Sequence, residues 1–164
     1  MDKLISQLVI DYPDFSYKVG TSFRWSPKNR EITYIRYSSK ITRWAVLHEL
    51  GHALLNHNSF SNDFELLKLE VSAWQKAIEL APRYNLTISP THVQNCLDTY
   101  REWLHSRSTC PACGLISTQY NPNLYRCFNC RSEWKVSSSR FCRAYRQLDK
   151  SRQKSSTKLQ TIFS

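Results

Sequence analysis

Two histidines and a glutamate stand within five consecutive residues, HELGH, at positions 48–52. On a helix His48 and His52 are one turn apart, so both imidazoles point the same way and can share one tetrahedral Zn²⁺. Glu49 lies next to them, where it can take a proton from water without being a ligand. The motif therefore predicts a catalytic zinc centre. The alternative is a buried helix that carries two histidines by chance.

Glu70 is the residue best placed to complete such a zinc site. A catalytic zinc normally takes three protein ligands and keeps a fourth position for water. If a second helix begins near Asp63 and runs back antiparallel to the motif helix, a partner of His52 must lie about six or seven residues into it. Glu70 stands at that height, so the spacing predicts it as the third ligand.

His57 is the rival third ligand. It follows His52 by five residues, and on a continuing helix that offset turns its side chain about 140° away. An immediate reversal of the chain would bring the side chain back, but the glycine that such a reversal usually uses is missing. We therefore expect His57 beside the site, on the surface or near the substrate, rather than on the metal.

The motif lies in a run at residues 41–57 that must form a buried helix, because few of its faces are polar. Ser38 or Ser39 can cap its start. Apolar spacing and capping residues predict three further helices, at residues 2–11, 63–81 and 90–106.

The segment between the first helix and the motif helix is aromatic and β-branched, with turn residues inside it. It predicts a small antiparallel sheet with strands at residues 15–19, 22–25 and 31–37. The last strand leads directly into the motif helix, and its free edge could hold an extended peptide substrate by strand addition. The alternative is an ordinary sheet strand. The expected fold class is α+β.

The sequence HELGHALLNH at residues 48–57 is followed, inside the next predicted helix, by EVSAW at residues 70–74. This pattern resembles the ImmA/IrrE family of gluzincin metallopeptidases, in which HELGH is followed by a short loop and then by a glutamate ahead of an alanine and an aromatic residue. The resemblance covers about residues 1–85. It implies a minimal zincin fold with four site residues: Glu49 as general base and His48, His52 and Glu70 as zinc ligands.

The same resemblance implies zinc-dependent hydrolysis of peptide bonds in a protein substrate, such as a regulator or a protein associated with nucleic acid. A donor is also needed to stabilise the oxyanion of such a reaction. The sequence offers three candidates for it: His92, Tyr34 and Tyr37.

Four cysteines form two CxxC pairs, Cys110 with Cys113 and Cys127 with Cys130, and thirteen residues separate the pairs. Two such turns joined by a β-rich hairpin are the signature of a zinc ribbon, in which four thiolates leave no position for chemistry. A disulfide pair or a redox motif is the alternative. We expect a structural zinc, because a unit of about 29 residues has too little core to fold without one.

Positive charge concentrates toward the end of the chain. Lys and Arg number 23 against 13 Asp and Glu, and residues 137–164 contribute six of the ten net positive charges. Such a cluster favours polyanions such as DNA or RNA, although a merely solvated tail is the plain alternative. The candidates for nucleic-acid contact are Arg126, Arg131, Lys135, Arg140, Arg143 and Arg146.

Two further features bear on that prediction. The last three of these arginines recur at three-residue intervals, which indicates one face of a basic helix. The ribbon also contains aromatic residues that could stack on bases or merely cover its small core: Tyr120, Tyr125, Phe128 and Trp134.

The 164 residues are enough for one compact domain and one small one. We expect a zincin-like metallopeptidase domain at residues 1–107, a zinc ribbon at 108–136 and a basic tail, partly helical or disordered, at 137–164. The CxxC pairs suit metal, the first residues lack the apolar core of a signal peptide, and no run reaches about 18 apolar residues. These observations predict a soluble, cytoplasmic protein without a membrane partner.

Two hypotheses of function remain. The first is a zinc-dependent endopeptidase brought to its substrate by the ribbon and the tail. The second is a non-catalytic, nucleic-acid-binding regulator that uses the zincin domain as a scaffold, for which Glu49 would not be needed. The layout is also that of the SprT-like family, which degrades proteins crosslinked to DNA, but that family uses a later histidine as ligand and none lies between His57 and His92.

Overall fold

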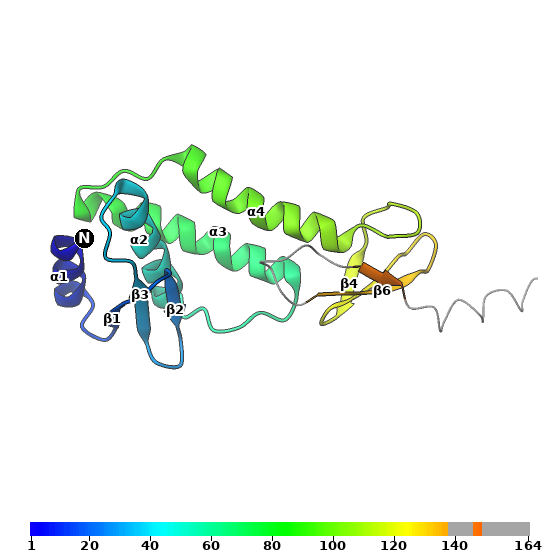
Figure 1. Ribbon diagram of the computed structural model, residues 1–164, viewed down its shortest axis with the longest axis horizontal. Coiled ribbons are helices and arrows are strands. Elements are labelled where there is room, and N and C mark those ends of the chain that lie inside the picture. Colours follow the sequence, from blue (N-terminus) through cyan, green and yellow to red (C-terminus); the bar gives the residue numbers. More distant parts are fainter. Residues whose placement is uncertain (138–145, 149–164) are drawn as a thin grey trace, which may run out of the picture. The chain divides into compact units, whose positions relative to one another are not determined.

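The computed structural model describes residues 1–137 and 146–148. These residues form an α+β protein with helices and two small sheets (Figure 1). The chain divides into two compact units. Unit 1 consists of Met1–Phe60 and Glu65–Leu97, and unit 2 consists of Ser61–Phe64 and the described residues from Asp98 onward.

The first part of the chain contains the predicted helices, and their existence is confirmed with small differences at their ends. The elements in chain order are α1 (Asp2–Asp11), β1 (Ser16–Val19), β2 (Arg24–Ser26), β3 (Glu31–Tyr34), α2 (Lys40–Leu54), α3 (Asp63–Leu80), the 3-10 helix η1 (Ala81–Tyr84) and α4 (Pro90–Ser108). The boundaries between the two units fall inside α3 and α4, so each of these helices has residues in both.

The sheet of unit 1 is mixed, so the prediction of a small antiparallel sheet is wrong. β3 lies in the middle, parallel to β1 and antiparallel to β2. After β1 the N–H of Gly20 donates to the carbonyl of Tyr34 at 2.9 Å, and a Cβ on Gly20 would clash with the methyl group of Thr33. Because Gly20 has no side chain, the chain after β1 can pass close to Thr33 of β3. It then forms β2 on the opposite edge of β3, and β1 remains parallel to β3.

This topology also corrects the expectation that the strand before the motif helix has a free edge. Both edges of β3 are paired, and the edge strands are β1 and β2. The outer edge of β2 faces α2, because the N–H of Trp25 donates to the carboxylate of Glu49 at 2.7 Å.

The motif helix α2 lies against the sheet and is the centre of the core of unit 1 (Figure 1). Its side chains Val46, Leu47 and Leu50 have no exposed surface. The helix begins with a reciprocal cap: the hydroxyl of Ser39 accepts from the N–H of Thr42, and the Thr42 hydroxyl accepts from the N–H of Ser39. Burial on several sides agrees with the apolar run that predicted this helix.

α3 approaches α2 unusually closely at Gly51. A Cβ on Gly51 would lie 2.5 Å from the carbonyl oxygen of Ala73, which is far too close for a real contact. The facing residues Ala73 and Ala77 are small and fully buried. Small residues on both helices therefore set the distance between the backbones, and with it the reach of side chains from α3 toward α2.

Unit 2 contains an antiparallel sheet of order β4-β5-β6-β7. Its strands are β4 (Thr118–Asn121), β5 (Leu124–Arg126), β6 (Glu133–Val136) and β7 (Arg146–Leu148). The buried cluster of this unit is small and includes two of the predicted metal ligands: Cys110, Tyr125, Cys127, Trp134 and Val136.

A buried ion pair joins the segments of unit 2. The guanidinium of Arg107 binds the carboxylate of Asp63, with Nε 2.5 Å from Oδ2, and Tyr125 donates its hydroxyl to the same oxygen at 2.5 Å. Arg107 also donates to the side chain of Asn123 and to the carbonyl of Ser137. The pair is fully satisfied, as a buried charge must be if the fold is to be stable.

The indole of Trp134, which is fully buried, donates to the carbonyl of Arg107 at 2.9 Å.

Within the part of the chain that the structure describes, no helix is long and apolar enough to cross a membrane.

Candidate metal centres

α2 and α3 bring three metal-binding side chains together. Nε2 of His48 lies 3.2 Å from Nε2 of His52 and 3.2 Å from one carboxylate oxygen of Glu70. The other Glu70 oxygen is 3.6 Å from Nε2 of His52. Nitrogen and oxygen ligands at about 2.0–2.1 Å from a tetrahedral zinc lie about 3.3 Å apart. The three donor atoms therefore have separations that fit one zinc ion.

The close approach at Gly51 is what allows this meeting. His48 and His52 flank Gly51 on α2, and Glu70 precedes Ala73 by three residues, about one turn of α3. His48 and Glu70 are both buried. Burial raises the pKa of Glu70, but interactions of its carboxylate with the imidazoles of His48 and His52 outweigh it and hold that pKa well below its usual range. Glu70 is therefore an anion, as a metal ligand must be.

Glu49 belongs to the same helix but lies outside the group of donor atoms that could share a metal. Its carboxylate is held by the N–H of Trp25 on the outer edge of β2. Burial raises the pKa of Glu49, although the charges of His48 and His52 oppose this. Trp25 was not predicted as a site residue, because a backbone donor leaves no mark on the residue type.

His57 is brought back to the site by a sharp turn at the end of α2. Asn56 has φ +53°, its N–H donates to the carbonyl of Ala53, and the N–H of His57 donates to the carbonyl of His52. This is the Schellman arrangement, with asparagine at the left-handed position that glycine usually takes. The chain therefore reverses without a glycine, contrary to the expectation from the sequence, because asparagine also adopts this conformation.

The reversal does not make His57 a ligand. Its Nδ1 lies 2.9 Å from Nδ1 of His52, on the side of that ring away from Glu70. Its Nε2 lies 3.4 Å from the hydroxyl of Ser72, and the indole of Trp25 donates to its carbonyl at 3.0 Å. Burial lowers the pKa of His57.

His48 is held by aromatic packing. Its ring stacks on Trp74 with centroids 4.3 Å apart, and its Nδ1 is buried with no hydrogen-bond partner among the described residues. Trp74 in turn contacts His92 edge to face.

The three candidates for the oxyanion donor lie in different surroundings. His92 packs between Trp74 and Trp44, and its Nε2 is 3.6 Å from the thiol of Cys96. Tyr34 is buried in the core, whereas Tyr37 is 73% exposed. The Trp74 indole contacts both His48 and His92, so His92 packs against the same aromatic side chain that holds the His48 ring.

The His48, His52 and Glu70 cluster is defined by its donor atoms and their geometry. Comparisons with protein-family models, curated proteins and solved structures found no match. Two imidazoles and one carboxylate are a donor set of zinc sites that keep an open position, whereas structural zinc sites are closed by four ligands. The cluster therefore differs in kind from the second group of ligands in this chain.

The second group consists of the four cysteines of unit 2. Sγ of Cys110 lies 3.6 Å from Sγ of Cys130, and Sγ of Cys113 lies 3.5 Å from Sγ of Cys127. Thiolates about 2.3 Å from a tetrahedral zinc would lie about 3.8 Å apart. All four sulfur atoms lie within 4.8 Å of one another, so they form one cluster that suits zinc.

The two CxxC turns have matching backbones. The N–H of Gly114 donates to the carbonyl of Cys110, and the N–H of Arg131 donates to the carbonyl of Cys127. Both donors are in the left-handed region, with φ +75° and +60°. A backbone hydrogen bond from Cys130 lowers the pKa of the Cys127 thiol to about 6, which favours the thiolate that binds metal.

The residues predicted to contact nucleic acid are not equivalent. Arg126 is ion-paired with Glu133, with Nη2 2.6 Å from Oε1, and stacks over Tyr120. Arg131 and Lys135 are exposed. Arg146 lies in β7 and donates to the carbonyl of Thr109, so the predicted basic helix does not include it. Arg140 and Arg143 lie outside the described residues.

The aromatic residues of the ribbon divide in the same way. Tyr125 and Trp134 are buried and stack on each other, so they cover the core and cannot stack on bases. Phe128 is 73% exposed on the second CxxC turn.

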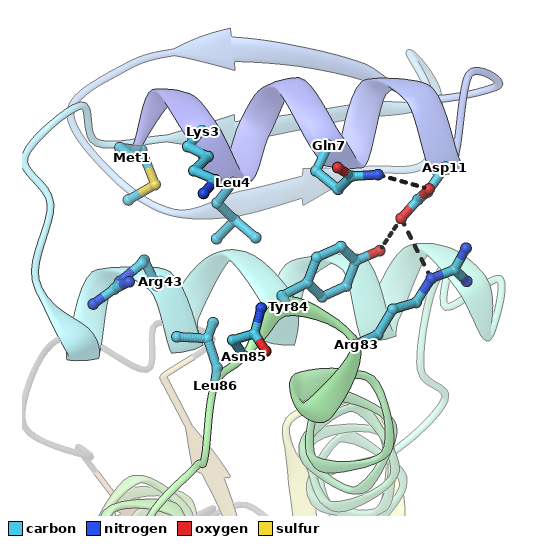
Figure 2. Close-up of a pocket in the computed structure, with 10 residues that line it drawn as sticks. All are labelled: Met1, Lys3, Leu4, Gln7, Asp11, Arg43, Arg83, Tyr84, Asn85 and Leu86. Carbon is cyan, nitrogen blue, oxygen red and sulfur yellow. Dashed lines mark hydrogen bonds and ion pairs between the residues drawn. The ribbon is translucent and has the colours of Figure 1, made fainter.

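Unit 1 also has a hollow of about 530 Å³, shown in Figure 2. At one end the carboxylate of Asp11 accepts from Tyr84 at 2.8 Å and from Gln7 at 3.2 Å, and it pairs with Arg83 at 3.4 Å. The metal-binding residues do not line this hollow. The Asp11 carboxylate at that end already has hydrogen-bond and ion-pair partners. We therefore assign the hollow no part in the chemistry of the two clusters.

Proposed function

We propose that this chain is a zinc-dependent endopeptidase of the ImmA/IrrE kind, with a minimal zincin fold and a gluzincin-type zinc centre. The observation that carries the proposal is that Glu70 on α3 meets both histidines of the motif on α2 at separations suited to one metal ion. A buried carboxylate such as that of Glu70 costs free energy unless its charge is compensated, and a cation shared with the two imidazoles would compensate it.

Glu49 is the residue that would move protons. It lies beside the ligands without joining them, and one oxygen of its carboxylate is fixed by the N–H of Trp25. The other oxygen can accept a proton from water and pass it to the leaving amine. Zinc, when bound by His48, His52 and Glu70, supplies a Lewis acid that polarises the scissile carbonyl and acidifies water.

The outer edge of β2 is the proposed place for the substrate. β2 is an edge strand, and the N–H of Trp25 on that edge is already directed toward Glu49. An extended peptide pairing along this edge would bring its backbone next to the general base. This supports a protein substrate with an accessible, extended segment.

Zinc content and a single carboxylate test the proposal. The wild-type chain should hold two zinc ions, and His48→Ala or Glu70→Ala should hold one. Glu49→Gln should keep both ions and lose peptide hydrolysis by about 10²–10⁴-fold, which is the usual contribution of a general base. Glu79→Gln is a matched control, because that carboxylate is paired with Lys76 on the exposed surface of α3.

Metal analysis and a comparison of cleavage products from a whole proteome, treated with wild-type or Glu49→Gln protein, give the readouts. A wild-type chain that holds only the ribbon zinc would remove the catalytic proposal. Identical cleavage products from the two proteins would do the same.

We further propose that the ribbon binds single-stranded nucleic acid and brings the peptidase to its substrate. The supporting observation is the exposed Phe128 on the same CxxC turn as the exposed Arg131. A ring of this kind can stack on bases of any sequence, and cations beside it can neutralise phosphates.

Salt dependence separates this binding from contact with a protein. Arg131→Ser should lower the slope of log affinity against log salt by about 0.7, which is one phosphate contact. Arg126→Gln should leave the slope unchanged, because Glu133 already neutralises that charge. Affinity that does not depend on salt would contradict nucleic-acid binding.

A further inference from the structure

A chain of hydrogen bonds runs outward from one of the two histidine ligands. Nδ1 of His52 is 2.9 Å from Nδ1 of His57, and Nε2 of His57 is 3.4 Å from the hydroxyl of Ser72. The Ser72 hydroxyl also lies 2.9 Å from the carbonyl of Leu69 and 3.1 Å from that of Lys68. The chain thus starts at the metal cluster on α2 and ends on the backbone of α3.

The direction of each hydrogen bond follows from what its members can donate. A serine hydroxyl has one hydrogen, and the carbonyl of Leu69 at 2.9 Å is nearer to it than Nε2 of His57 at 3.4 Å, so the hydrogen of Ser72 goes to the backbone of α3. Toward His57 the hydroxyl can then only accept, which places a hydrogen on Nε2 of His57. A neutral imidazole with hydrogen on one nitrogen has a lone pair on the other, so Nδ1 of His57 accepts.

The hydrogen of the His52 ring is placed by its contact with His57. Because Nδ1 of His57 accepts, Nδ1 of His52 carries the hydrogen and donates at 2.9 Å. Nε2 of His52 is therefore left with its lone pair, and this is the atom that faces Glu70 and His48. A metal can be bound only by a nitrogen in that state.

We propose that His57 is a positioning residue, which holds His52 in the tautomer and orientation that bind the metal. Ligating histidines usually donate their second nitrogen to a carboxylate, a carbonyl or water. Here a histidine takes that place and is itself directed by Ser72. The inference deepens the proposed function and rests on it only in requiring that His52 binds a metal.

The backbone shows why His57 stays in position. Asn56 reverses the chain, and the N–H of His57 is bound to the carbonyl of His52. The indole of Trp25 donates to the carbonyl of His57 at 3.0 Å, from the strand whose N–H holds Glu49. Three segments, from β2, α2 and α3, thus fix one imidazole.

Of the two histidine ligands, only His52 has a second histidine as the hydrogen-bond partner of its Nδ1 in the described residues. Within the described residues Nδ1 of His48 has no hydrogen-bond partner, and the ring of His48 is fixed by stacking on Trp74. Loss of His57 should therefore affect the metal through His52 and leave the packing of His48 unchanged.

The test measures zinc affinity of the full chain by competition with a chelator, with the ribbon zinc of the same molecule as the internal reference. His57→Ala should weaken binding at the His48, His52 and Glu70 cluster by about 10–100-fold, the usual effect of removing a ligand's hydrogen-bond partner. His57→Gln, whose amide oxygen can accept from His52, should recover most of the affinity. Ser72→Ala should have a smaller effect in the same direction. His105→Ala, at an exposed histidine of unit 2, is the matched control and should change neither zinc.

A second readout separates positioning from a merely structural role. In zinc-free wild-type protein, ¹⁵N spectra of the imidazoles should show His52 with hydrogen on Nδ1, and in His57→Gln this form should persist. In His57→Ala the hydrogen should distribute between both nitrogens. Unchanged zinc affinity in His57→Ala, or an unchanged His52 tautomer, would overturn the inference while the proposed function stands. A wild-type chain without zinc at this cluster would instead overturn the proposed function.

Discussion

The two groups of candidate metal ligands in this chain are built in opposite ways. The cluster of unit 1 has its ligands on two long helices that already pack through Gly51 and the alanines of α3. The cluster of unit 2 has its ligands on two short turns, and two of the five residues of its small core are themselves cysteine ligands. Metal would add chemistry to a finished fold in the first case and would complete the fold in the second.

The number of ligands points the same way. Three donors leave a position for a reacting molecule, whereas four thiolates close the tetrahedron. The surroundings agree, because His48 and Glu70 are buried and individually held, while Cys113 and Cys130 are exposed and depend on the turns that carry them. The proposed site for chemistry is thus defined before a metal arrives, and the proposed structural site is defined with it.

Removal of both metals should have the largest effect on folding, and it tests whether the two clusters differ in their dependence on metal. Chelation should unfold the ribbon, since structural zinc contributes about 10–16 kcal/mol in small zinc domains, while the helices of unit 1 should remain. Amide hydrogen exchange would show protection lost at β5 and β6 and kept at α2. Equal loss of protection in α2 would contradict the distinction between the two clusters.

Removal of the buried ion pair between Arg107 and Asp63 tests whether zinc alone stabilises unit 2. Arg107→Met leaves the carboxylate of Asp63 buried without its cation and should cost about 3–5 kcal/mol in urea unfolding of the zinc-loaded chain. Arg101→Met is the control, because its pair with Asp98 is exposed and should contribute less than about 1 kcal/mol. Similar losses in the two variants would show that zinc alone holds the unit.

Gly51→Ala tests whether the first cluster depends on the contact between its helices. The added methyl group meets the carbonyl of Ala73, so we expect a loss of stability of about 1–3 kcal/mol. Zinc affinity at the His48, His52 and Glu70 cluster should fall as well, because the helix that carries Glu70 must move away. The ribbon zinc should be unaffected, and equal weakening of both zinc ions would argue against this explanation.

The smallest expected effect on stability comes from single substitutions that compare the two CxxC turns of the ribbon. Arg131→Gly should stabilise the zinc-loaded ribbon by up to about 1 kcal/mol, because arginine at φ +60° is strained where glycine is not. Gly114→Ala, at the equivalent position with open space around it, should destabilise it by a similar amount. Thermal unfolding of both variants measures this, and effects of the same sign would contradict the equivalence of the turns.

The ligand clusters could be predicted because their signals are local or depend on simple geometry. One helical turn separates the two histidines, and the rise per residue was enough to place Glu70 opposite them. The four cysteines were predicted by spacing alone. The turn at Asn56 had a local signal too, since asparagine tolerates the left-handed region, but it was sought only in glycine.

Other parts could not be predicted because they depend on the packing of distant segments. Asp63 and Arg107 are 44 residues apart, and nothing near either residue indicates the other. The parallel pairing of β1 with β3 depends on how the chain passes Thr33, and the N–H of Trp25 is a backbone group that every residue but proline would offer. Periodicity describes which face of an element is buried, but not which element buries it.

The ion pair of Asp63 has a consequence for how such a chain can evolve. Asp63 is the first residue of the helix that carries Glu70, yet it belongs to unit 2, where Arg107 and Tyr125 bind it. A gene fragment cut before the ribbon would encode Asp63 and Arg107 without the Tyr125 hydroxyl that donates to the Asp63 carboxylate. The two units are therefore interwoven in sequence, and recombination could not exchange the ribbon as an independent module without also replacing residues 61–64.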